Sequence, residues 1–359
     1  MVGCARHYAS RNAVALIRIV TSMDTAIYLG TDDGLYVVRS SSGSDGEWHG
    51  KMRLKSQVVR CITAGARGSK MLYCGAFDEG VYRSNDGGAS WGFCDGAPRR
   101  VLSLAVAGSE DSSVVYAGTE PSAVFRSDDG GASWHELPSL LTLASAKTWS
   151  FPPRPETHHV RYILPDPNVP RRLYVAIEAG ALLRSDDGGQ TWRDRVPGGP
   201  RDTHTLAAHP NAPGRLYSAA GDGYFESTDS GDTWRRISDG LNHQYCWSVA
   251  VSIGDPDTIL LTSSKSARDA HSKSFENSFY RRSAGGWWHE VRDGLPASEE
   301  RRVGLVAASA VEPDLFYAAW ESDIYRSIDG GVRWQRLMVN WAGDPHPGHV
   351  VSLAVVESD

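Results

Sequence analysis

The sequence has few long hydrophobic runs, no stretch of basic residues and no paired cysteine motifs. No apolar run approaches the roughly 18 residues that a membrane-spanning helix needs, and the run at residues 14–20 is interrupted by Arg18. No small-residue cleavage pattern follows it, so we expect neither a signal peptide nor a membrane partner.

The cysteines and the charge exclude further classes of protein. Five cysteines are an odd number without paired spacing, which favours reduced thiols and a cytoplasmic location. The formal net charge is -6 and the pI is about 6.1. Because no run of Lys or Arg offsets this charge, we expect no nucleic-acid partner.

Glycine and tryptophan are abundant instead, with 37 and 12 copies in 359 residues. Most tryptophans close one motif, which reads Arg-Ser-Asp-Asp-Gly-Gly-Gln-Thr-Trp at 184–192. Clear copies lie at 83–91, 126–134, 184–192, 226–234 and 326–334, and degenerate copies end at Trp48 and Trp288. Seven copies with a period near 43 residues are typical of a β-propeller.

Each repeat also reads as four short strands. In the third repeat the apolar runs are 101–106, 114–117 and 123–126, followed by a strand that Trp134 begins. Gly, Asp and Ser turns separate these runs. We therefore predict an all-β, seven-bladed β-propeller.

The motif Ser-x-Asp-x-Gly-x-Thr-Trp resembles the Asp-box, or BNR repeat, of sialidases, sortilin-type receptors, some xyloglucanases and photosystem assembly factors. The whole-chain pattern also resembles YVTN/BNR-like bacterial proteins described as glycosyl hydrolases. The resemblance implies that each box is a structural turn between the third and fourth strands of a blade, with its Trp packed between blades. This role falls to Asp86, Asp129, Asp187, Asp229 and Asp329.

The chain ends in an apolar run at 350–356 that matches the inner strand at 101–106. We expect it to pair with the first blade and close the ring, which removes exposed strand edges. Residues 14–20 compete for the same place. We predict a propeller domain over 23–359 and a flexible extension over 1–22.

Strand order places the boxes on one face and the longest loops on the other, which we call the top. The insertions at 139–157 and 263–278 lie there, and long loops on a rigid scaffold often bind ligands. Trp149, Trp247 and Trp320 also fall on the top, where exposed aromatic rings can stack on a saccharide.

Alignment of the inner strands brings polar residues to the mouth of the pore. His204 aligns with Arg60, Arg161 and Trp247. Two positions earlier, Asp202 aligns with His159, Tyr245, Arg100, Arg302 and His349. The candidate ligand-binding residues are Arg60, Trp149, His159, Arg161, His204, Trp247, Arg302, Trp320 and His349. Arginine suits carboxylate or phosphate ligands.

These residues favour a site for a small polar or anionic ligand, such as a saccharide. The sequence leaves open whether the chain is an enzyme. As a glycoside hydrolase it needs two carboxyl groups, for which Glu178 and Asp202 are the candidates. The resemblance to sialidases, which use a tyrosine nucleophile, adds Tyr245.

Two alternatives remain. One is a non-catalytic scaffold that binds a protein on its top face. The other is a metal-dependent enzyme that uses His159, His204 and His349 as axial ligands. The leading hypothesis requires no cofactor.

Overall fold

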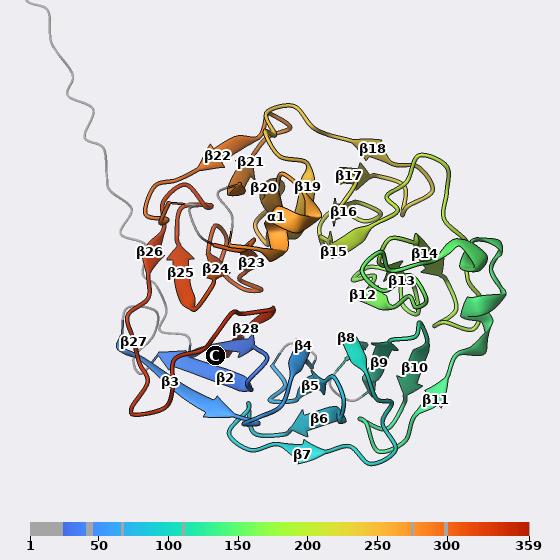
Figure 1. Ribbon diagram of the computed structural model, residues 1–359, viewed down its shortest axis with the longest axis horizontal. Helices are drawn as coiled ribbons and strands as arrows, with labels where there is room; N and C mark the ends of the chain where they lie inside the picture. Colours follow the sequence, from blue (N-terminus) through green and yellow to red (C-terminus); the bar gives the residue numbers. More distant parts are fainter. Residues whose placement is uncertain are drawn as a thin grey trace, which may run out of the picture.

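The structure is a computed structural model that describes residues 24–40, 46–65, 68–109, 112–273, 276–297 and 301–358. These residues form seven sheets, antiparallel except for one short parallel pair, which are arranged as the blades of a ring around a central channel (Figure 1). The predicted all-β, seven-bladed propeller is therefore confirmed. The flexible extension predicted for residues 1–22, and the competing strand at 14–20, lie outside the described residues.

The blades are numbered along the chain, and their strands are given from the channel outward. Blade one contains β28 (Ser352–Ser358), β1 (Asp24–Gly30), β2 (Leu35–Ser40), β3 (Trp48–Arg53) and β27 (Val339–Asn340). Blade two contains β4 (Val59–Ala64), β5 (Leu72–Ala76), β6 (Gly80–Ser84) and β7 (Gly92–Phe93). Blade three contains β8 (Val101–Ala107), β9 (Val114–Thr119), β10 (Val124–Ser127) and β11 (His135–Glu136). Blade four contains β12 (Val160–Pro165), β13 (Leu173–Ile177) and β14 (Ala181–Ser185).

The remaining blades each have four strands. Blade five contains β15 (Thr203–Ala208), β16 (Leu216–Ala220), β17 (Gly223–Ser227) and β18 (Arg235–Arg236). Blade six contains β19 (Tyr245–Ser252), β20 (Asp255–Ser264), β21 (Asn277–Arg282) and β22 (His289–Val291). Blade seven contains β23 (Leu305–Ala308), β24 (Phe316–Trp320), β25 (Asp323–Ser327) and β26 (Gln335–Arg336).

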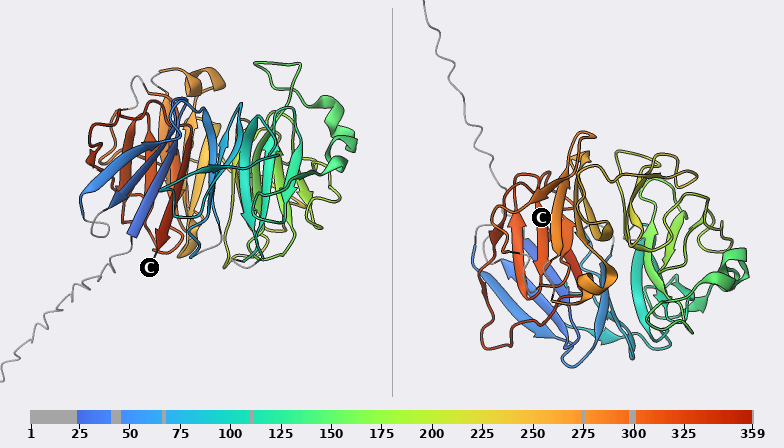
Figure 2. Two further views of the ribbon diagram at one scale, coloured as in Figure 1. Left: turned by 90° about the horizontal axis from the view of Figure 1, so that it is seen from below. Right: turned by 45° about the horizontal axis from the view of Figure 1, so that its top comes forward.

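Short helices occupy the two predicted insertions. The segments η2 (Pro138–Thr142) and η3 (Ala144–Thr148) follow blade three, and α1 (Ala267–His271) lies between β20 and β21. In Figure 2, α1 caps the face opposite the C-terminus. Within the part of the chain that the structure describes, none of these helices has the length or hydropathy of a membrane span.

Burial explains why the strands alternate in character. The second strand of most blades is buried along its whole length, as in β5, β13, β16 and β24. Each such strand is covered on both faces by neighbouring blades, so it reads as a continuous apolar run. The inner strand β4 alternates between buried and half-buried residues because one of its faces lines the channel.

The repeated turn uses its own polar groups internally. In blade four, Ser185 Oγ accepts a hydrogen bond from the Gly189 amide at 2.8 Å, and Asp187 accepts one from the Thr191 amide at 2.9 Å. Burial opposes ionisation, but the hydrogen bonds from Thr191 and Ser185 lower the pKa of Asp187 to about 2. Trp234 and three other motif tryptophans donate their indole N–H to the glycine three residues earlier. The five aspartates therefore occupy structural positions.

The C-terminal segment closes the ring from two sides. β28 pairs antiparallel with the whole of β1 on the channel side, as the sequence predicts. β27 pairs in parallel with the outer strand β3 of the same blade. Between them, Trp341 is 7% exposed and packs against Tyr36 at a ring distance of 5.6 Å.

Candidate functional site

A polar cavity lies at the mouth of the channel, on the face that carries α1. It has a volume of about 550 Å³ and lies where the inner strands begin. The charged and aromatic residues that line it are Asp32, Arg60, Phe77, Glu120, Phe151, Arg154, His159, Arg161, Glu178, Trp247, His271, Arg302 and His349.

A β-bulge occurs at the same position in five inner strands, beside this cavity. The pairing of β4, β8, β12, β15 and β19 with the next strand skips one residue in each case. The skipped residues are Arg60, Leu102, Arg161, His204 and Trp247. Bulges redirect side chains and are common next to active sites. The shared register supports the sequence alignment of Arg60, Arg161, His204 and Trp247.

Most of the predicted site residues meet at this mouth. Seven of them line the cavity: Arg60, His159, Arg161, Glu178, Trp247, Arg302 and His349. His204 borders a narrower space deeper in the channel, of about 280 Å³. Two more of the predicted residues contact His204, since Tyr245 Oη lies 3.2 Å and Asp202 Oδ2 lies 3.7 Å from its Nε2 atom.

Trp149 and Trp320 depart from the expectation that they are exposed binding platforms. Trp149 is 5% exposed and Trp320 is 2% exposed. The Trp149 indole donates to Ser145 Oγ at 3.0 Å, and the Trp320 indole donates to the Arg302 carbonyl at 2.7 Å. Both rings pack in apolar clusters beneath the top loops, so we do not retain them as ligand contacts.

Glu178 follows β13 and is held by His159, which directly precedes β12, and by Arg161 within β12. His159 Nε2 lies 2.7 Å from Glu178 Oε2, and Arg161 Nε lies 3.4 Å from the same oxygen. Because a carboxylate only accepts, the histidine nitrogen donates this hydrogen bond. Burial alone would raise the pKa of Glu178, but the His159 hydrogen bond and the Arg161 charge lower it to about 2.

Asp202 faces Glu178 from the loop that precedes β15. The Ala179 amide donates to Asp202 Oδ1 at 2.7 Å, which ties the two loops together. Burial raises the pKa of Asp202, and the charge of Glu178 acts in the same direction. Burial likewise raises the pKa of Tyr245. The pKa values of these two neighbouring carboxyl groups are therefore shifted in opposite directions.

A second buried carboxylate, Glu120, anchors the insertion at 139–157. Its side chain is fully buried, and its two oxygens lie 2.6 Å from Arg100 Nη2 and 2.6 Å from Arg154 Nη2. Arg154 belongs to the insertion, so this ion pair joins the insertion to blade three. Arg154 also lies over the ring of Phe151, with its Cζ atom 5.3 Å from the ring centre.

Glu321, which follows β24, is a further carboxylate that pairs with an arginine of the cavity lining. The Arg302 amide donates to it at 2.6 Å, and Arg302 Nη1 and His349 Nδ1 lie 3.2 and 3.4 Å away. Burial would raise its pKa, but the contact with His349 and the Arg302 amide lower the pKa of Glu321 to about 2. This carboxylate is ionised in the neutral range and holds the Arg302 side chain.

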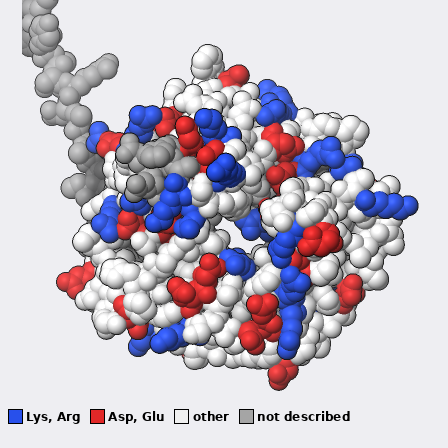
Figure 3. Space-filling view, viewed as in Figure 1, with Lys and Arg blue, Asp and Glu red and all other residues white. Residues whose placement is uncertain are grey.

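The carboxylates are more buried than the guanidinium groups paired with them. The exposed fractions are 43% for Arg154 against 0% for Glu120, and 33% for Arg302 against 16% for Glu321. Asp32 is the exception, since it is more exposed than its partner Arg60. Figure 3 shows blue Lys or Arg side chains at the rim of the central opening. The surface that a ligand meets is therefore largely cationic.

Six of the charged and aromatic lining residues are not among the predicted site residues: Asp32, Phe77, Glu120, Phe151, Arg154 and His271. Phe151 and Arg154 come from the first insertion, and His271 comes from the second. Phe77 lies after β5. Phe151, Arg154 and His271 could have been proposed because they lie in the two predicted insertions. No pattern in the sequence distinguishes Phe77 from other loop residues. Burial lowers the pKa of His271 to about 4, so its ring is neutral at pH 7.

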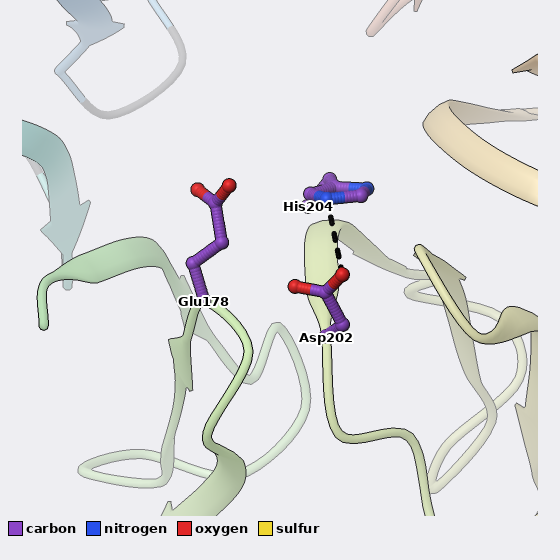
Figure 4. A group of neighbouring side chains, drawn as sticks. All are labelled: Glu178, Asp202 and His204. Carbon is purple, nitrogen blue, oxygen red and sulfur yellow. Dashed lines mark ion pairs between the residues drawn. The ribbon is translucent and has the colours of Figure 1, made fainter. Parts of the chain in front are cut away.

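Among the described residues, one group of three side chains brings metal-ligating atoms together. The atoms come from Glu178, Asp202 and His204 and lie within 4.8 Å of one another (Figure 4). His159 and His349, the other members of the predicted histidine set, contact Glu178 and Glu321 instead. The histidine set therefore forms no common cluster in this part of the chain.

No protein-family model matches the chain, and no curated protein matches it. Solved structures do resemble it. An ancestral GH74 enzyme has 17% identity and a TM-score of 0.59, with 84% of this chain and 38% of that chain covered. The GH74 enzyme of Niastella koreensis has 14% identity and a TM-score of 0.64, covering 88% of this chain and 55% of that one.

A second kind of structural neighbour is matched over nearly its whole length. YCF48 bound to D1 peptide has 14% identity and a TM-score of 0.57, with 94% of this chain and 96% of that chain covered. By contrast, this chain spans 38% and 55% of the two GH74 enzymes. At these identities the likeness shows the β-propeller fold that all of these proteins share with this chain.

Proposed function

We propose that the cavity at the channel mouth binds a small acidic saccharide. The observation that carries this proposal is the arrangement of the charges, with guanidinium groups facing the cavity and most of their carboxylate partners buried behind them. A carboxylate on the ligand accepts paired hydrogen bonds from such arginines. A cavity of about 550 Å³ is in the usual range for small-molecule sites.

The aromatic part of the wall supports a sugar ring as the body of the ligand. Trp247 lines the cavity, and the guanidinium of Arg161 lies 4.7 Å from its ring centre. Phe151 and Phe77 add apolar surface. The fold is shared with GH74 glycoside hydrolases and with a peptide-bound propeller. A saccharide or a protein partner fits that likeness, and the arginines that converge on a cavity of small-molecule size favour the saccharide.

A binding experiment with paired ligands tests this proposal. In calorimetry we expect glucuronate or galacturonate to bind and glucose to bind far more weakly. Arg302→Gln should weaken binding about 10- to 100-fold, because a charge-assisted hydrogen bond is lost. Arg292→Gln is the matched control, since the exposed Arg292 pairs with Glu290 of the outer strand β22 and does not line the cavity. Equal binding of glucose, or no binding of any acidic sugar, would refute the proposal.

Hydrolysis of a glycosidic bond is a second candidate. It is favoured by the facing carboxyl groups of Glu178 and Asp202, whose nearest ligand atoms lie within 4.8 Å. Retaining glycosidases place two carboxyl groups roughly 5–5.5 Å apart. We expect release of reducing ends from acidic oligosaccharides, with kcat/KM about 100-fold lower in Glu178→Gln and in Asp202→Asn. Activity that survives in both variants would contradict hydrolysis at this pair.

A further inference from the structure

We propose that Glu178, Asp202 and His204 form a binding site for a divalent transition-metal ion, with Zn²⁺ the best fit. This set differs from the three histidines that the sequence suggested, because two of its ligands are carboxylates. The proposed metal site uses neither Arg302 nor Arg60, although Glu178 also lines the cavity proposed to bind the anion.

The positions of the three ligand atoms are close to those that a zinc ion requires. They lie within 4.8 Å of one another, and the pair formed by His204 Nε2 and Asp202 Oδ2 lies at 3.7 Å. Ligands about 2.1 Å from a tetrahedral zinc ion are about 3.4 Å apart. Small side-chain rotations therefore bring all three onto one ion. Figure 4 shows the Glu178 carboxyl standing beside the Asp202 carboxyl and the His204 ring.

The imidazole of His204 is prepared as a ligand by its other nitrogen. His204 Nδ1 lies 2.7 Å from the Cys246 carbonyl oxygen. Because a carbonyl only accepts, Nδ1 carries the proton, and the lone pair of the neutral ring is on Nε2. Nε2 is the atom that faces Asp202. Metal-bound histidines commonly donate their second N–H to a backbone carbonyl in this way.

In each carboxylate, one oxygen contacts neighbouring protein groups and the other oxygen remains for the metal ion. The Ala179 amide donates to Asp202 Oδ1, whereas Oδ2 is the atom near His204. His159 and Arg161 both contact Glu178 Oε2, so Oε1 remains for the ion. Such outer contacts orient metal ligands and raise metal affinity.

Three protein ligands leave a fourth position of a tetrahedral ion open, as in catalytic zinc sites. Glu178 lines the main cavity, so that position can reach a ligand held there. Tyr245 competes with the ion for His204, because its hydroxyl lies 3.2 Å from His204 Nε2 and must turn away when the ion binds. Removal of this hydroxyl should therefore preserve zinc binding.

Zinc titration of the full chain after treatment with a chelator tests the site. All measurements use a Cys4→Ser background, because a thiolate near the N-terminus is itself a zinc ligand. We expect one Zn²⁺ per chain and weaker binding of Mg²⁺, which prefers all-oxygen sites. Glu178→Gln and Asp202→Asn should each weaken zinc binding by at least about tenfold.

Two further variants make the result decisive. Tyr245→Phe should bind zinc at least as tightly as the parent chain. Glu276→Gln is the matched control. Glu276 Oε2 lies 3.2 Å from His243 Nε2 and belongs to a different ion pair, so this replacement should not change the zinc affinity. Circular dichroism confirms that each variant is folded. The site is refuted if the chelated chain takes up no zinc, or if Glu178→Gln and Asp202→Asn bind like the parent.

The zinc site and glycoside hydrolysis make opposite demands on one pair of carboxyl groups. A bound ion occupies Glu178 and Asp202, so neither is then available as a general acid or base. Turnover that rises when zinc is removed would support hydrolysis and refute a functional zinc site. Acidic-sugar binding that depends on Arg302 is a separate result and survives either outcome.

Discussion

Replacing Glu226 with alanine is expected to lower the free energy of unfolding by about 3–5 kcal/mol, because it leaves the buried guanidinium of Arg282 without its partner. The side chains of Glu226 and Arg282 are 8% and 3% exposed and form a direct ion pair. Tyr224 also donates its hydroxyl to Glu226 Oε1 at 2.7 Å. This pair joins blades five and six, so its loss weakens the contact between neighbouring blades.

Urea denaturation monitored by tryptophan fluorescence measures this change in the free energy of unfolding. The matched control is Arg292→Ala, which breaks the exposed pair of Arg292 and Glu290 at 2.7 Å and should cost less than about 1 kcal/mol. A double replacement of Glu226 and Arg282 by methionine should recover much of the loss, since neither charge remains buried. A small effect of Glu226→Ala, similar to that of the control, would contradict the assigned role of the pair.

Removing residues 352–359 is expected to lower Tm by more than about 10 °C, or to leave the chain aggregated, because it opens the ring. All seven residues of β1 pair with β28. The side chains of β28 pack on both sides, Leu353 and Val355 in one apolar cluster and Ala354 and Val356 in another. Glu357 also accepts hydrogen bonds from Ser309 and Ala310 of blade seven.

Scanning calorimetry of two truncated chains tests this closure. The comparison is a chain that lacks residues 1–22, which the sequence predicts to be an extension of the propeller. We expect that chain to keep the Tm of the full-length protein. If both truncations leave Tm unchanged, β28 does not hold the ring together. If both lower it, the first 22 residues contribute to folding, contrary to the prediction.

The fold was accessible from the sequence because it is repeated. One motif recurring about every 43 residues fixed the blade count, and the unmatched final run at 350–356 identified the closing strand. Each inference rests on local patterns that tertiary contacts reinforce. The strand boundaries followed as well, since β8 and β9 begin at Val101 and Val114 as predicted.

The site was only partly accessible, because side-chain burial depends on contacts that sequence spacing does not encode. Alignment placed Arg60 and Arg161 at one level, and their shared bulge accounts for this. Trp149 and Trp320 have the residue type expected of a ligand platform, yet both are buried in apolar clusters formed with residues from several strands. The link between Arg154 and Glu120 joins segments whose separation leaves no pattern in the sequence.

The two-sided closure of blade one has a consequence for synthesis on the ribosome. β1 emerges early but pairs with β28, whose residues follow roughly 330 positions later, and such distant contacts form slowly. The inner edge of the first blade must therefore wait until the residues of β28 have been translated. During that interval the nascent chain exposes the unpaired edge of β1, which is apolar. We therefore expect a chaperone to bind the nascent chain.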